Sequence, residues 1–88
     1  MEDDTTAVLA SLRARMQARA RELAQEVRSY PSPIARCDEQ LPGLIEARSR
    51  AMELARRAAE LERERASMPE AEWRSRVSRL AAEAERLR

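Results

Sequence analysis

The chain has 88 residues, with 17 Arg against 16 acidic residues, no Lys or His, one Cys and a formal net charge of +1. It therefore lacks the commonest general base, the commonest zinc ligand and the lysine of phosphate-binding loops, and one Cys without a His makes no zinc site. The balanced charge also argues against a dedicated nucleic-acid-binding protein, which usually carries an excess of positive charge on one face.

A first helix is predicted over residues 5–29. Apolar residues recur there every three or four positions, which is the spacing of one helical face. Asp4 or Thr5 can cap its start. The prolines at 31 and 33 end it, because a residue before proline is pushed out of the helical region. The apolar positions are Leu9, Leu12, Met16, Ala20, Leu23, Val27 and Tyr30.

A second helix is predicted over residues 33–66, with two apolar stripes of the kind that a helix needs to cover two neighbours. Pro42 lacks a backbone N–H and Gly43 is a poor helix former, so we expect a kink there. That bend either shapes the helical hairpin alone or opens a groove for a partner. One stripe comprises Ile34, Cys37, Leu41, Ile45, Met52, Ala55 and Ala59; the other comprises Leu44, Ala47, Ala51, Leu54, Ala58 and Leu61.

A third helix is predicted over residues 69–87, and Ser67 and Glu70 stand at the spacing of a capping box at its start. Short connections favour antiparallel neighbours. The expected fold is therefore all-α: a single domain over residues 1–88, built as a bundle of three antiparallel helices. The apolar face of the third helix comprises Trp73, Val77, Leu80, Ala84 and Leu87.

The third helix is too short to accompany the second along its whole length. The second stripe already begins at Leu44, where the third helix has nearly ended. We therefore expect Leu41, Leu44 and Ile45 to form an apolar patch used for dimerisation or for binding a partner. Trp73 is either the core anchor of the third helix or, because Trp is enriched at interfaces, a further partner contact.

Arg48 falls within the apolar arc of the second helix, where a charge needs a partner. Its stem can lie on apolar surface while the guanidinium reaches Glu22, Glu26 or solvent. The alternative is a contact with an anion, or with a carboxylate of a ligand or partner.

Four arginines of the first helix form a basic cluster, with no acidic residue between Asp4 and Glu22. They are the candidate nucleic-acid contact, although only two aromatic residues are present to stack on bases. The alternative is that they are flanking charges of an amphipathic helix. The four are Arg13, Arg15, Arg19 and Arg21.

The segment Ile34-Ala-Arg-Cys-Asp-Glu-Gln-Leu41, followed by Leu44-Ile-Glu-Ala-Arg48, is similar to the first long helix of the all-helical chorismate mutases. The resemblance implies that Arg48 helps to hold a substrate carboxylate. The family's catalytic lysine, however, has no counterpart between Ala55 and Ala59, and its preceding arginine would fall on the proline break. An enzyme of this kind is therefore a remote alternative.

We expect a small non-catalytic protein-interaction module, such as an adaptor, a small chaperone or a regulatory subunit, that self-associates as a dimer. No metal or cofactor is expected. The acidic start of the chain lacks a signal-peptide pattern, and no apolar stretch approaches the roughly 20 residues of a membrane span, so we expect a cytoplasmic location. The preference for Arg over Lys is typical of a GC-rich genome and indicates a bacterial source.

Overall fold

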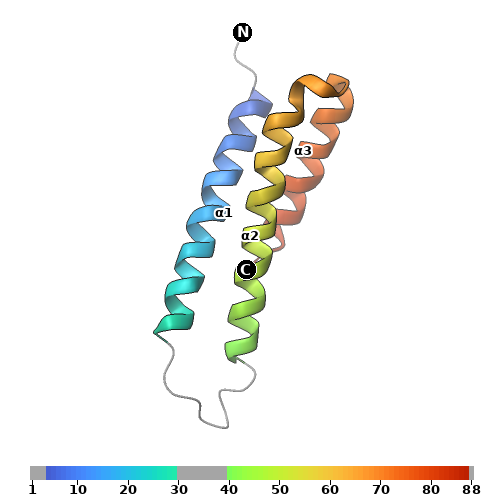
Figure 1. Cartoon of the computed structure of the whole chain (residues 1–88). Helices are drawn as coiled ribbons and strands as arrows, with labels where there is room; N and C mark the ends of the chain where they lie inside the picture. The colour runs from blue at the N-terminus through green and yellow to red at the C-terminus, as the bar shows by residue number, and fades with distance from the viewer. Residues whose placement is uncertain (1–3, 30–39, 88) are drawn as a thin grey trace.

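The computed structural model describes residues 4–29 and 40–87, which form three α-helices and no strand (Figure 1). The prediction of an all-α bundle of three helices is confirmed. The elements are α1 (Asp4–Arg28), α2 (Gln40–Glu64), the short 3-10 helix η2 (Arg65–Ser67) and α3 (Glu70–Glu85).

α1 and α2 lie side by side and run in opposite directions (Figure 1). Near the start of α1, Arg13 forms an ion pair with Glu62 near the end of α2. Further along α1, Leu23 packs with Ala51, which comes earlier in α2. α3 turns back along the later half of α2 and leaves the other end of the hairpin to α1 and α2. The described part of the molecule is elongated, with extents of 54 × 18 × 17 Å.

The core consists of two clusters of buried side chains. The larger cluster joins all three helices, and its members recur every three or four positions along each helix, as an amphipathic pattern requires. The smaller cluster joins α1 and α2 and contains Ala20, Leu23 and Ala51. The larger cluster contains Leu9, Leu12, Met16, Leu54, Ala55, Ala58, Leu61, Trp73, Val77, Leu80 and Ala84.

Trp73 is the centre of the contact between α2 and α3. Its side chain is 1% exposed, and its Nε1 donates a hydrogen bond to the Leu61 carbonyl oxygen at 2.8 Å. The guanidinium of Arg65 lies over the ring, 4.8 Å from the centroid, which is a cation–π distance. Trp73 is therefore a core anchor, and its interpretation as an exposed partner contact is wrong for this fold.

The connection between α2 and α3 ends one helix and starts the next. Ser67 Oγ donates a hydrogen bond to the carbonyl oxygen of Glu64, the last residue of α2, at 2.9 Å. Pro69 is the N-cap of α3, and its carbonyl accepts a hydrogen bond from the Trp73 backbone N–H at 3.0 Å. The predicted capping box between Ser67 and Glu70 is wrong, because Ser67 bonds back to α2.

Pro42 is the third residue of α2 and lies in its first described turn. Proline is tolerated in the first turn of a helix, where the N–H groups have no intrahelical partner. Gly43 has no positive φ, and a Cβ there would meet nothing within 4 Å. The expected kink depends on helix on both sides of Pro42, and residues 33–39 lie outside the described residues.

The predicted ends of the helices otherwise lie within two residues of the observed ones. The predicted end of α2 lies beyond the observed one because the last turn tightens into η2, as helix ends often do. Within the described ranges, no helix is both long and apolar enough to cross a membrane.

Candidate interaction surface

α3 covers one end of the α1–α2 hairpin and stops before the other (Figure 1). After α3 ends, Leu87 packs against the smaller cluster, as Leu44 and Ala47 of α2 also do. Beyond that point the described residues form two helices and not three. We call the three-helix part the body (residues 4–19, residues 52–64 and α3) and the two-helix part the arm (residues 20–28 and 40–51).

Few large buried side chains hold the arm together. Leu23 is 1% exposed, and the other buried members of its cluster are the alanines at 20 and 51. Leu44 and Ala47 are partly buried against them. The arm therefore buries less apolar surface than the body does, and gains less stability from it.

The apolar surface of the arm includes most of the interface predicted from the sequence. Ile45 is 46% exposed, and Leu41 and Leu44 are half-buried. Met52, just past the arm, is 50% exposed. The sequence pattern places Met52 on the same stripe as Ile45, but outside the predicted patch, which lies near Pro42.

Leu41, Ile45, Arg48 and Met52 form what we call the outer stripe of α2. Their spacing of four, three and four residues places them on one face of the helix. Each of the four is half-buried or exposed. The outer stripe is thus an apolar strip on the surface with one arginine in its middle.

Arg48 forms no ion pair with Glu22 or Glu26, the two carboxylates that the sequence suggested as possible partners. The guanidinium of Arg19 lies 3.3 Å from a carboxylate oxygen of Glu22 and 4.0 Å from one of Glu26. Arg48 is exposed and has no ion pair within residues 4–29 and 40–87. Of the three expected positions for the guanidinium, solvent is the one observed, and neither Glu22 nor Glu26 is its partner. A substrate-holding arginine would need a deep polar pocket, and the described residues place Arg48 on the surface.

The four arginines predicted to contact nucleic acid do not gather into one positive surface. Arg13 Nε pairs with Glu62 of α2 at 2.5 Å, and Arg19 pairs with carboxylates of its own helix. Arg15 and Arg21 are exposed, with no acidic partner among the described residues. Two unpaired guanidinium groups offer fewer phosphate contacts than the cluster of four suggested.

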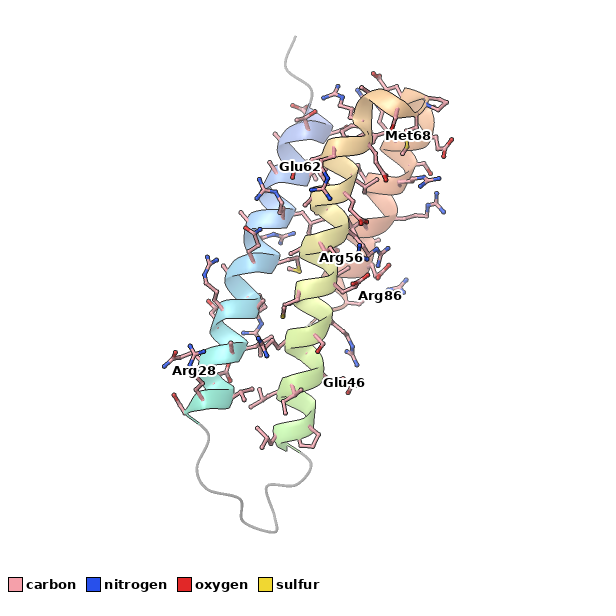
Figure 2. The ribbon with its side chains drawn as sticks, in the orientation of Figure 1. Arg28, Glu46, Arg56, Glu62, Met68 and Arg86 are labelled. Carbon is pink, nitrogen blue, oxygen red and sulfur yellow. The ribbon has the colours of Figure 1, made fainter. Side chains whose placement is uncertain are left out.

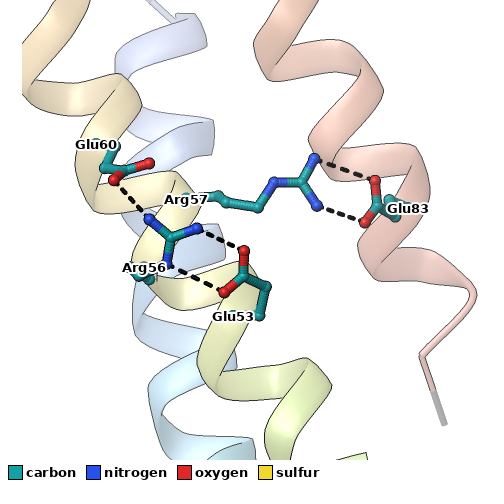
Figure 3. Close-up of polar contacts among 5 residues, drawn as sticks. All are labelled: Glu53, Arg56, Arg57, Glu60 and Glu83. Atoms are coloured by element: carbon teal, nitrogen blue, oxygen red, sulfur yellow. Dashed lines mark hydrogen bonds and ion pairs between the residues drawn. The ribbon is translucent and has the colours of Figure 1, made fainter.

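Charged side chains cover the outer faces of the helices, as Figure 2 shows for Arg28 and Glu46 on the arm. In the body, Arg56 bonds to Glu53 and Glu60 of its own helix, whereas Arg57 bridges to Glu83 of α3 at 2.6 and 3.2 Å (Figure 3). The hydrogen bonds from these arginines lower the pKa values of Glu53 and Glu83. Both carboxyl groups are therefore ionised at neutral pH, which favours ion pairing over proton transfer.

A groove of about 540 Å³ runs between α2 and α3, beside the Arg57–Glu83 bridge. Its lining is mostly charged, and several of these charges are already paired within the chain. Among the described residues, no group of three or more acidic, His or Cys side chains is placed to hold a metal ion. The groove is lined by Arg57, Glu60, Leu61, Glu64, Arg76, Arg79, Leu80 and Glu83.

Comparisons of the chain with protein-family models, with curated proteins and with solved structures give no significant match.

Proposed function

We propose that the chain is a non-catalytic bacterial interaction module of the cytoplasm that binds another protein through the outer stripe of α2. The proposal is carried by one observation: α3 ends early, and two large apolar side chains, Ile45 and Met52, stand about half exposed on one face of α2. Exposed apolar surface on a small domain is typical of an interaction site. An adaptor, a small chaperone or a regulatory subunit would use such a surface.

The position of Arg48 indicates which chemical groups the partner's binding surface carries. An arginine between apolar side chains becomes partly desolvated when a partner covers the strip, and it then needs a carboxylate. An apolar partner helix with one Asp or Glu facing Arg48 would supply both the packing and a charge-assisted hydrogen bond. A second copy fits this strip less well, because antiparallel pairing centred between Ile45 and Met52 would bring Arg48 beside its own symmetry mate.

The test is capture of binding proteins from a bacterial lysate with the tagged full chain, with and without nuclease and at low and high salt. We expect a defined protein that the native chain and the Val8→Glu variant recover and that the Ile45→Glu variant loses. Val8 is a matched control because it is 49% exposed, against 46% for Ile45, and lies outside the arm. Arg48→Glu should reduce recovery more than Arg48→Gln, because it repels the partner's carboxylate.

Equal recovery by the native chain and Ile45→Glu would rule out the outer stripe as the binding surface. The native chain could instead recover nucleic acid. If that recovery is lost on nuclease treatment, at high salt and in an R15E/R21E variant, the result would support a nucleic-acid-binding protein. Those two arginines are the members of the basic cluster without a described acidic partner.

A further inference from the structure

One face of α1 carries charges in an order that complements itself. Arg15, Arg19, Glu22 and Glu26 recur at steps of four, three and four residues, which places them on one side of the helix. The two basic residues come first along the chain and the two acidic residues follow. We call these four residues the α1 charge stripe.

Two copies of this stripe match when they run in opposite directions. If the helices cross at the midpoint between Ala20 and Arg21, then Arg15 lies opposite Glu26 of the second copy, and Arg19 lies opposite its Glu22. Both pairs share the same midpoint, so one alignment satisfies all four charges. A parallel alignment would place like charges opposite each other, which disfavours it.

The charges of a single chain are unevenly satisfied along the stripe. Arg19 lies 3.3 Å from Glu22 and 4.0 Å from Glu26, so one guanidinium serves two carboxylates. Arg15 is exposed and has no acidic partner among the described residues. The antiparallel alignment gives Arg15 a carboxylate and leaves Arg19 with one.

The surface beside the stripe is grooved. A groove of about 660 Å³ lies where the end of α3 meets α1, and Arg15, Arg19 and Glu22 border it. The rest of its lining is Met16, Ala18, Ala84, Glu85 and Leu87. The small alanine side chains let another helix come close, and Leu87 adds apolar surface for it to cover.

We propose that two copies of this chain associate through antiparallel α1 charge stripes, each arm lying beside the body of the other copy. This assigns the surface for the self-association expected from the sequence, and it rests on the proposed function only in treating the chain as an interaction module. It does not use the outer stripe of α2, so either proposal can fail without the other.

Sedimentation of the purified full chain at about 10 mM salt, where charges act over about 30 Å, tests the proposal. We expect a dimer. The R15E/R19E variant makes the stripe wholly acidic and E22R/E26R makes it wholly basic, so each should raise the dissociation constant at least ~10-fold through repulsion between copies. An equimolar mixture of the two variants should associate again. The fourfold exchange R15E/R19E/E22R/E26R should associate as the native chain does.

Helix content by circular dichroism shows whether each variant is folded, and E72R/R76E on α3 is the matched control, because it exchanges an exposed ion pair outside the stripe. A native chain that stays monomeric at about 100 µM would overturn the proposal, as that excludes even a weak dimer. Double variants that dimerise like the native chain would overturn it too, as would a mixture that stays monomeric. Loss of the dimer with retained capture of a partner protein by the outer stripe would remove this inference alone.

Discussion

The body and the arm share the same two helices, but different contacts hold them together. In the body, α3 places Trp73, Val77 and Leu80 against α1 and α2, so the apolar positions of the hairpin are closed on a third side. In the arm, Leu23 packs between alanines and the partly buried Leu44. The pattern of α2 is equally apolar in both regions. The length of α3 therefore decides which apolar side chains of α2 are exposed on the surface.

Among the changes that test this difference between body and arm, removing Trp73 should lower the free energy of unfolding the most. Trp73→Ala deletes a fully buried ring and its hydrogen bond to the Leu61 carbonyl oxygen, so we expect a loss of about 3–5 kcal/mol in the free energy of unfolding. A small domain has about 5–15 kcal/mol in total. Urea denaturation followed by circular dichroism measures the loss. Trp73→Phe should cost about half as much, and equal costs for the two changes would show that the ring does not anchor α3.

Leu12 and Leu23 are a matched pair, because each is 1% exposed, one in the body and one in the arm. Leu12→Ala leaves a cavity between three helices, whereas Leu23→Ala leaves one that two helices can partly close. We expect the free energy of unfolding to fall by about 3–4 kcal/mol for Leu12→Ala and by about 2 kcal/mol for Leu23→Ala, since the cost of a cavity depends on how far its walls relax. Thermal or urea unfolding of the two variants checks the difference. Equal losses would mean that the arm is as tightly packed as the body.

Glu83 joins α3 to α2 through Arg57, whereas Glu53 pairs within its own helix (Figure 3). Glu83→Gln should lower the free energy of unfolding by about 0.5 kcal/mol, because a half-exposed ion pair contributes little. The hydrogen bond from Arg57 lowers the pKa of Glu83 from its ordinary value of 4.5. This contribution is therefore present above pH 4.5 and is lost as the pH falls through the lowered pKa.

NMR titration of the two carboxyl groups checks this prediction. Arg57→Gln should return the pKa of Glu83 toward its ordinary value and leave that of Glu53 low, because Arg56 is its main cause. A pKa of Glu83 that does not move would show that the bridge does not form in solution.

The smallest effect is expected at the outer stripe. Ile45→Glu should change the free energy of unfolding by less than about 0.5 kcal/mol, because the side chain is nearly half exposed. A melting curve beside that of Val8→Glu is the measurement. A loss above about 1.5 kcal/mol would place Ile45 in the core of the arm and remove it as a binding residue.

The helical fold and most of the core could be predicted because they depend on local pattern. Apolar residues at steps of three and four identified the buried face of α1, including Leu9, Leu12 and Leu23. The same reasoning placed Trp73 on the buried face of α3. These positions follow from the period of the helix, which each segment carries by itself.

The candidate site was harder to predict because it depends on which side chains compete for one partner. The sequence left Glu22, Glu26 and solvent open for Arg48, and it could not show that Arg19, on the same helix as both glutamates, lies beside them. Periodicity places a residue on a face and says nothing of such competition. It also could not show that Arg13 turns to Glu62 of another helix, which divides the basic cluster.

The burial of the chain's single tryptophan makes the two regions separable by optical methods. Trp73 lies under Arg65 at the contact between α2 and α3, so its fluorescence reports the body, whereas far-ultraviolet circular dichroism sums the helices of both regions. Denaturation curves that coincide would mean that body and arm unfold as one cooperative unit. A dichroism curve that falls first would measure, without any label, how much earlier the arm opens.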